Sequence, residues 1–539
     1  MHEEEREMKQ IYYNGNIHTM NGSIVQAMAV EDGIIKAVGN DEEILALAAE
    51  GDTKTDLEGR GVVPGFNDSH CHVLLTGLQD ERLNLTGAKS IQEIIERGRS
   101  YIEENHLAKG QWIIGGGYDQ NIFDEPVLPD GQVLDEISKE HPIMIERVCG
   151  HIGAANPLAL EMAGFADGPE IAGGVFDRDA DGNLTGIIRE SALDTFKRHI
   201  PKPDVEATKN AILRVAARAN AAGLTSMQTD DLEGAPFETV LQAYHELENE
   251  GRLTVRIFEE VQAARPQILE KFLKHGLRTG DGTLYFKIGN IKLITDGSLG
   301  ARTAYLREDY GDDAGNRGIA VYTQDELDEM VMMAHKAGMQ VAAHAIGDGA
   351  IEQCIHAFEK AYASDGVDMR NRVVHCQFVD KEMLERMAKS HICADIQTPF
   401  VPSDIPLVDS RIGNRVMGYV WKTMAEYGIH AGGGSDSPVE NFAPIWGIHC
   451  AVNRCDEAFL PEGGWHPEEK LSVEDAVKLY TQGSAYVSFE ENIKGTLAPG
   501  YLADFVVLSQ NIFNVPSEKI LETHVLKTYV GGKCVYTGE

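Results

Sequence analysis

The sequence predicts an α/β protein built around a parallel TIM (β/α)8 barrel. Between about residues 62 and 488, short runs of β-branched and other apolar residues alternate with stretches of helical periodicity, which is typical of repeated βα units. Eight such runs can be recognised, and eight strands close this type of barrel. The length of 539 residues is compatible with it, because these barrels often exceed the size of an average domain.

The predicted barrel strands are spread over most of the chain, and we expect residues 62–488 to form the barrel. In chain order, the strands are Val62–Phe66, Leu224–Thr229, Leu253–Glu259, Ile288–Ile294, Met339–His344, Arg372–Cys376, Ile392–Ile396 and Ile429–Gly433. Between the fourth and fifth, Asp325–Lys336 has apolar residues at steps of three and four and stops before Gly338. This spacing predicts a helix with one apolar face.

Both ends of the chain predict a smaller β structure. Short runs bounded by turn residues indicate antiparallel strands near the N-terminus, and a strand and a hairpin near the C-terminus. The predicted elements are strands at Ile11–Asn16, Ile24–Val30 and Ile34–Val38, a helix at Asp41–Ala49, a strand at Ala503–Leu508 and a hairpin at Val525–Tyr536. We therefore expect residues 1–61 and 489–539 to form one composite β-sandwich domain.

A long segment, from about residue 73 to 222, separates the first and second predicted barrel strands. It contains two further strand-like runs, Trp112–Ile114 and Ile143–Val148. Loops at the carboxyl ends of barrel strands carry the functional additions of this fold. We therefore expect this segment to be an insertion over the barrel mouth.

The acidic composition argues against several classes of partner. Asp and Glu number 85 and Lys and Arg 48, so the formal net charge is −37. Such a surface repels a phosphate backbone and an anionic membrane, and we expect no nucleic acid or membrane partner. The acids are spread along the chain and say little about the substrate. A small molecule is the expected partner, and formation of a homo-oligomer is left open.

The N-terminal sequence and the cysteines indicate a cytoplasmic protein. The segment MHEEEREMKQ lacks the basic and apolar regions of a secretory signal, and no stretch approaches the 18 or so apolar residues that span a bilayer. The eight cysteines are scattered without a CxxC pair. This distribution is typical of reduced, packed thiols rather than of a disulfide framework or a zinc ribbon.

Histidines and an aspartate at the ends of predicted strands indicate a metal centre. His70 and His72 follow the first strand, and alternate residues at a strand end point the same way, so both can reach one metal. His344 and His375 end the fifth strand and nearly end the sixth, and Asp436 follows the eighth. Any one of them alone would more often be structural. Together, at the strand ends where TIM barrels place catalytic groups, they predict a metal site.

Lys292 is a charged residue inside the fourth predicted strand, which is costly unless the charge has a partner. An ammonium group cannot bind a metal. If the amine reacts with carbon dioxide, the carbamate is an anion whose two oxygens can bridge two metals. Alternatively, Lys292 pairs as an ammonium with Asp296 or with a substrate carboxylate. Both interpretations remain open from the sequence.

Several segments together carry a resemblance to a known family. They are VVPGFNDSHCH, WIIGGGYDQ, ERVCGHIGAAN, IKLITDGSLGART, VAAHAIGD, RVVHCQF, GGGSDSP and GTLAPGYLADFVVL. With them the chain resembles the amidohydrolase superfamily, and more closely its family 3 branch, which includes YtcJ-like proteins and N-substituted formamide deformylases. The resemblance extends over nearly the whole chain and is not specific for a substrate.

The resemblance implies a (β/α)8 barrel beside a β domain made from both termini. It implies metal ligands at His70, His72, His344, His375, Asp436 and carboxylated Lys292. It also implies that His151 and Asn156, from the insertion, face the substrate, with ordinary polar pairing inside the insertion as the alternative. Further candidates for the substrate pocket, with structural roles equally open, are Tyr118, Asp119, Asp296 and Arg302.

This site predicts hydrolysis of a non-peptide C–N bond in a small molecule. One or two divalent ions, most simply Zn²⁺, would lower the pKa of a bound water from about 16 toward 7 and so supply hydroxide. Asp436 would pass the proton to the leaving amine, and His151 would stabilise the oxyanion. The alternatives are a one-metal deaminase or an ester or lactone hydrolase on the same scaffold, and a non-catalytic, metal-stabilised regulatory protein.

Overall fold

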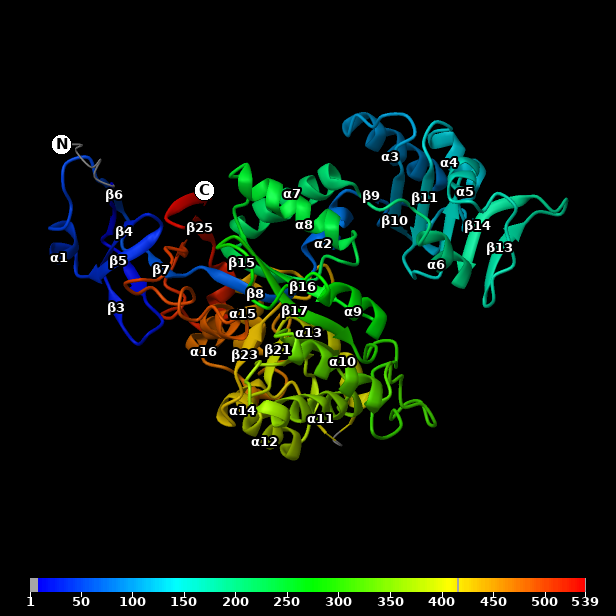
Figure 1. Cartoon of the computed structure of the whole chain (residues 1–539). Coiled ribbons are helices and arrows are strands. Elements are labelled where there is room, and N and C mark those ends of the chain that lie inside the picture. Colours follow the sequence, from blue (N-terminus) through cyan, green and yellow to red (C-terminus); the bar gives the residue numbers. More distant parts are fainter. Residues whose placement is uncertain (1–7, 414–415, 539) are drawn as a thin grey trace. The chain divides into compact units, whose positions relative to one another are not determined.

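The computed structural model describes residues 8–413 and 416–538, and the chain forms two compact units (Figure 1). The first unit contains the chain up to Gly77 and from Asp204 onward, and the second contains Leu78–Pro203. The domain boundaries expected from the sequence, and the position of the insertion over the barrel mouth, stay predictions.

The first unit is built on an eight-stranded parallel sheet that forms the predicted TIM barrel. Its strand order is β8, β15, β16, β17, β18, β19, β21 and β23, and each neighbouring pair is parallel. The strands are β8 (Phe66–Cys71), β15 (Leu224–Thr229), β16 (Arg256–Gln262), β17 (Phe286–Ile294), β18 (Val341–Ala345), β19 (Arg372–His375), β21 (Cys393–Ile396) and β23 (Ala431–Gly433). All eight overlap the strands expected from the sequence, the first of them at Phe66 alone.

For the first strand, the expected range Val62–Phe66 is wrong except at Phe66, where β8 begins. Residues of β7 (Gly61–Pro64) pair instead with β2 (Asn16–His18) and β24 (Phe505–Leu508) in another sheet. The barrel begins with β8, whose polar side chains from Asn67 to His70 are all buried. Apolar periodicity identifies β7 because its residues are apolar, and it misses β8 because that strand buries polar groups.

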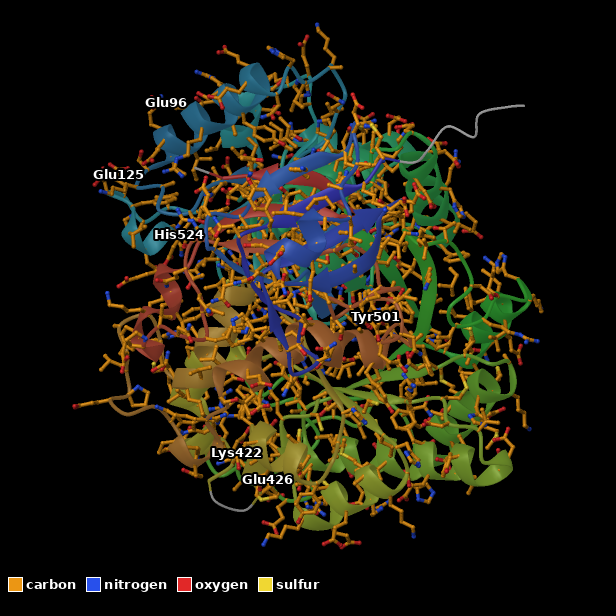
Figure 2. The ribbon with its side chains drawn as sticks, turned by 90° about the vertical axis from the view of Figure 1, so that its left-hand side faces the viewer. Glu96, Glu125, Lys422, Glu426, Tyr501 and His524 are labelled. Atoms are coloured by element: carbon orange, nitrogen blue, oxygen red, sulfur yellow. The ribbon has the colours of Figure 1, made fainter. Side chains whose placement is uncertain are left out.

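Helices follow the barrel strands and bury one face each. The expected helix is confirmed as α10 (Gln324–Lys336), which begins at a capping box between Thr323 and Glu326. The short helix α14 (Trp421–Glu426) shows the same division: Trp421 and Met424 are buried, whereas Lys422 and Glu426 are exposed (Figure 2). Within the described residues, no helix combines the length and apolar character needed to cross a bilayer.

Two further sheets are formed by the ends of the chain: the first by N-terminal strands alone, and the second by strands from both ends. One has the order β5, β4, β1, β6, and the other has the order β26, β25, β24, β7, β2, β3. The new strands are β1 (Gln10–Tyr13), β3 (Ile24–Val25), β4 (Ala27–Glu31), β5 (Ile34–Gly39), β6 (Thr53–Asp56), β25 (Val525–Val530) and β26 (Lys533–Thr537). Tyr12, Met28, Val62, Phe505 and Tyr529 belong to one buried cluster that both sheets share, so the sheets pack as a sandwich.

The second unit is a six-stranded mixed sheet covered on both faces. Its order is β13 (Gly174–Arg178), β14 (Leu184–Glu190), β12 (Ile152–Ala155), β11 (Ile143–Arg147), β10 (Ile113–Tyr118) and β9 (Leu83–Asn84). Side chains alternate between faces: Ile143 and Ile145 lie in one apolar cluster, and Met144 lies in another. The two strand-like runs expected in this segment overlap β10 and β11.

A buried ion pair joins the barrel to the terminal sandwich. Arg256 of β16 donates from Nε to Oδ2 of Asp504 over 2.6 Å and from Nη2 to Oδ1 over 2.9 Å. Both side chains are 4% exposed. Removing one partner of such a pair leaves an uncompensated buried charge, which costs more than the pair itself contributes.

We predict that Asp504→Asn lowers the free energy of unfolding by about 3 kcal/mol, because Arg256 keeps its buried charge and loses its counter-ion. The shift of the urea midpoint measures this effect. The same substitution at exposed Asp167 is the control and should change stability by less than about 0.5 kcal/mol. Equal shifts in the two variants would contradict the prediction.

Candidate metal centre

Two histidines of the first barrel strand converge on the aspartate that follows the last. His70 lies near the end of β8 and His72 immediately follows that strand. The Nε2 atoms of His70 and His72 lie 3.3 and 3.2 Å from Oδ1 of Asp436. Residues 364 or more positions apart in the sequence therefore meet at a single carboxylate oxygen.

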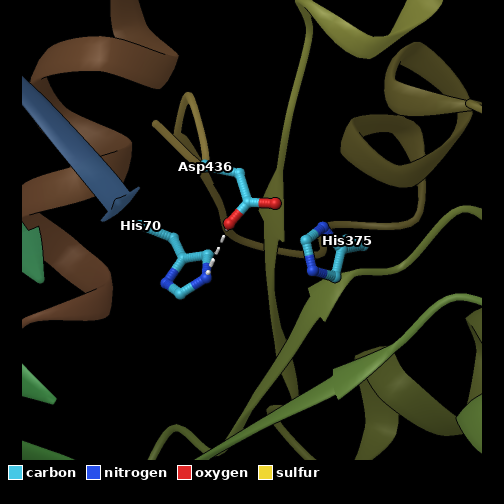
Figure 3. Close-up of side chains that lie close together, drawn as sticks. All are labelled: His70, His375 and Asp436. Carbon is cyan, nitrogen blue, oxygen red and sulfur yellow. Dashed lines mark ion pairs between the residues drawn. The ribbon is translucent and has the colours of Figure 1, made fainter. Parts of the chain in front are cut away.

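His375 and His344 complete this group from two further strands. His375, at the end of β19, forms with His70 and Asp436 a set whose candidate ligand atoms all lie within 4.8 Å of one another (Figure 3). The ring centroids of His344 and His375 are 4.5 Å apart. The structure thus brings together all four histidines and the aspartate that the sequence placed at the strand ends.

The backbone takes an unusual conformation at two of these residues. His375 and Asp436 have φ of 72° and 58°, in the left-handed region that is costly for residues with a Cβ. The backbone N–H of Asp436 donates to the carbonyl of His70 over 2.8 Å. Tertiary contacts therefore fix the direction of the Asp436 side chain at the expense of local backbone preference.

Hydrogen bonds tie the loop that carries Asp436 to β8. The carboxylate of Asp68 accepts from Oγ of Ser435 over 2.6 Å, and from the backbone N–H groups of Ser435 and His70 over 3.1 Å each. Gly434 precedes these residues, and a Cβ there would lie 2.9 Å from the backbone N of His70. The first and last strands of the barrel can approach this closely only because that position is glycine.

Three imidazoles are oriented by oxygen acceptors on their Nδ1 side. Nδ1 of His70 faces Oε2 of Glu260 at 2.9 Å, Nδ1 of His72 faces the carbonyl of Asp230 at 3.0 Å, and Nδ1 of His375 faces Oε1 of Gln397 at 2.8 Å. These oxygens require a hydrogen on Nδ1, so the lone pair of each ring lies on Nε2 when the ring is neutral. Metal-binding histidines are oriented in this way in many proteins.

His344 is held through the other ring nitrogen. Its Nε2 donates to the carbonyl of Gly297 over 3.2 Å and lies 3.4 Å from Oδ1 of Asp296. Asp296 itself accepts from the backbone N–H groups of Tyr305, Ile346 and Gly347. Nδ1 of His344 is therefore the nitrogen that carries the lone pair.

The charges at the site differ from one residue to the next. Burial lowers the pKa of His344 to about 4, with Lys292 acting in the same direction. For His72, burial alone would lower the pKa, but the hydrogen bond to Asp436 and its charge outweigh it and raise the pKa to about 9. For Asp436, burial alone would raise the pKa, yet the hydrogen bonds from His70 and His72 hold this pKa well below its usual value. Asp436 is therefore an ionised carboxylate.

Lys292 of β17 points to the same place and is 1% exposed. Its Nζ lies 2.8 Å from Nε2 of His70 and 3.7 Å from Oε2 of Glu260. The carboxylate that the structure offers to a Lys292 ammonium is therefore Glu260, and not Asp296 as the sequence suggested.

Glu260 of β16 is the residue that the sequence interpretation missed. It is fully buried and touches both His70 and Lys292. The run RIFEEVQ did contain a usable signal, because a charge inside a buried strand needs a partner. The expected strand ended at Glu259, and this placed Glu260 outside it.

Comparison with known proteins agrees with this geometry. The amidohydrolase family matches residues 54–536. This chain belongs to the amidohydrolase family. YtcJ of Bacillus subtilis is 34% identical over 98% of this chain and 99% of its own length, and the N-substituted formamide deformylase of Arthrobacter pascens is 23% identical over 97% of each chain.

A solved structure supports the same assignment. An uncharacterized metal-dependent hydrolase from Pyrococcus furiosus superposes with a TM-score of 0.80 and 30% sequence identity, covering 94% of this chain and 100% of that chain. The resemblance inferred from the sequence motifs is confirmed, and the barrel is that of an amidohydrolase.

The remaining predicted site residues of this amidohydrolase make other contacts within their own units. In the first unit, Arg302 forms a two-point ion pair with Asp312. In the second unit, Asp119 pairs with Arg147, and Tyr118 is buried.

His151 and Asn156 also belong to the second unit. His151 is exposed and pairs with Glu190. Asn156 is buried; its Oδ1 caps α5 (Pro157–Met162) and accepts from the N–H of Ile143. Their predicted substrate contacts, like those of Tyr118, Asp119, Asp296 and Arg302, stay predictions.

We predict that Gly434→Ala lowers the free energy of unfolding by about 1–3 kcal/mol, because the new methyl group overlaps the backbone of His70. Chemical denaturation measures the change. Gly300→Ala is the matched control, since a Cβ at Gly300 has no heavy atom of the described structure within 4 Å outside its chain neighbours. Wild-type stability in Gly434→Ala would show that the approach of this loop to β8 is not tight.

Proposed function

We propose that this amidohydrolase is a metal-dependent enzyme that cleaves an amide-type, non-peptide C–N bond of a small molecule, such as an N-substituted formamide or an N-acyl amine. The observation that carries the proposal is the convergence of His70 and His72 on one oxygen of Asp436, with His375 close by. Similarity to the deformylase of Arthrobacter pascens supports the amide-type substrate.

The donor set fits a divalent cation such as Zn²⁺. Imidazole nitrogens and a carboxylate oxygen are its preferred ligands, along with thiolates. Each histidine is fixed through one ring nitrogen, so the other nitrogen carries the lone pair when the ring is neutral. We assign one or two ions to the ligands His70, His72, His344, His375 and Asp436, together with Lys292 if it carries a carbamate.

The cation and Asp436 would have different roles in the reaction. When bound, a divalent cation would lower the pKa of a water molecule to about 7 and polarise the amide carbonyl. The ionised carboxylate of Asp436 takes the proton of the attacking water and delivers it to the nitrogen of the departing amine. Proton delivery is required because an unprotonated amine leaves poorly.

Proton competition makes metal binding dependent on pH. Hydrogen bonds and charge from Asp436 raise the pKa of His72 to about 9 in the absence of a cation. A protonated imidazole has no lone pair to offer, so cation binding must release this proton. Zn²⁺ affinity should therefore rise with pH up to about 9 and level off above it.

We predict that Asp436→Asn lowers kcat by about 10²–10⁴-fold, because the amide offers an oxygen to the metal and cannot accept a proton. Turnover of a panel of N-formyl and N-acyl amines, together with elemental analysis of the protein, measures both properties. Asp167→Asn, at an exposed position, is the control. Wild-type turnover in Asp436→Asn would exclude the proton-transfer role.

The products of the same panel test the type of bond that is cleaved. Equimolar amine and acid are expected from an amide. Amino-substituted heterocycles, esters and lactones added to the panel test the alternatives. Turnover of the amino compounds alone, with release of ammonia, would assign a deaminase. Hydrolysis of the esters or lactones alone would assign an esterase or lactonase. Failure to hydrolyse any compound with full metal occupancy would favour the regulatory alternative.

We predict that Lys292→Ala loses metal and activity, and that short carboxylic acids restore both in part, if Lys292 carries a carbamate. An added carboxylate can then occupy the space of the missing anion. If Lys292 acts as an ammonium beside Glu260, added acids should not help, because two carboxylates would repel each other. Metal content and rate, each with and without acetate, distinguish the two states. A fully active variant with unchanged metal content would remove Lys292 from the site.

A further inference from the structure

A buried carboxylate in the barrel interior, that of Glu260 on β16, connects His70 of the candidate metal centre to side chains on β17 and β19. Oε2 of Glu260 lies 2.9 Å from Nδ1 of His70. Oε1 of Glu260 accepts from Nη2 of Arg372 over 2.8 Å and from Nδ2 of Asn290 over 3.0 Å. All four side chains are buried. One carboxylate oxygen of Glu260 therefore faces His70, and the other accepts hydrogen bonds from Arg372 and Asn290.

Arg372 is itself held in place. Its Nη1 donates to Oε1 of Gln228 over 2.7 Å and lies 3.1 Å from Oδ2 of Asp395. Gln228 in turn donates from Nε2 to the carbonyl of Ser484 over 2.8 Å. Glu260 is thus anchored by groups on other elements of the barrel and cannot rotate away from His70 without breaking these bonds.

The donors around Oε1 restrict which residue type at position 260 can also accept a hydrogen bond from His70. Arg372 and Asn290 both present N–H groups to Oε1, so an oxygen is required there. An amide side chain in this position would keep its oxygen toward these donors and turn its NH₂ group toward His70. Only a carboxylate offers an acceptor in both directions.

We propose that Glu260 is a positioning residue for the metal centre: it fixes the hydrogen of His70 on Nδ1 and so presents Nε2 as the ligand atom. This inference rests on the proposed metal centre and goes beyond its ligand set. A carboxylate on the remote nitrogen also makes an imidazole a stronger ligand, and losing such a partner typically weakens metal binding by about 10–100-fold.

The test compares Glu260→Gln with the same substitution at Glu259. Glu259 is the preceding residue of β16 and is also buried, but its carboxylate accepts from the backbone N–H of Asp231. Zn²⁺ affinity is measured by competition with a chromophoric chelator, without any substrate. We expect Glu260→Gln to bind Zn²⁺ about 10–100-fold more weakly and Glu259→Gln to stay within about threefold of the wild type.

A conservative variant separates positioning from general stability. Glu260→Asp keeps an acceptor for His70 and a negative charge for Arg372 on a shorter side chain. We expect its Zn²⁺ affinity to lie between those of the wild type and Glu260→Gln. If Glu260→Gln does not fold, an unchanged affinity in Glu260→Asp overturns the proposal.

Further outcomes of these measurements test the positioning role and the proposed function separately. Wild-type affinity in folded Glu260→Gln, or an equal loss in Glu259→Gln, would overturn the positioning role. A Glu260-dependent affinity in a protein that hydrolyses no amide would leave this inference standing and overturn the proposed function alone. A wild-type protein that binds no Zn²⁺ would overturn both.

Discussion

The buried ion pair between Glu260 and Arg372 is the constraint on which the candidate metal centre depends. Both side chains are fully buried inside the barrel and belong to different strands. A buried charge must be paired and hydrogen-bonded to be tolerated, so each additional polar group nearby is fixed in turn. One consequence is the direction of the His70 ring, and through it the direction of its free lone pair.

The backbone of the loop that carries Asp436 imposes a second constraint on the site. Asp436 reaches His70 and His72 only because the loop after β23 packs closely on β8. This approach requires glycine at position 434 and a left-handed backbone at Asp436. Strain of this kind persists where surrounding contacts determine the conformation. The hydrogen bonds that Asp68 accepts from Ser435 and His70 supply some of those contacts.

Much of the barrel could be predicted from the sequence because seven of its strands lie in short segments with several apolar or β-branched residues, and these segments alternate with helical patterns. The strand β8 could not, since Asn67, Asp68, Ser69 and His70 are polar although buried. The same property hid Glu260. Periodicity detects burial through apolar side chains, and it fails where a strand buries polar groups that find partners only in the folded barrel.

The sequence by itself determined the fold class, the family and the four histidines and one aspartate of the candidate site, because strand ends in a barrel meet at one face. Only the tertiary structure decided which nitrogen of each histidine is free, which carboxylate stands beside Lys292, and how Asp436 is aimed. These features depend on contacts between residues far apart in the chain. Hydrogen-bond geometry of that kind leaves no periodic trace in the order of amino acids.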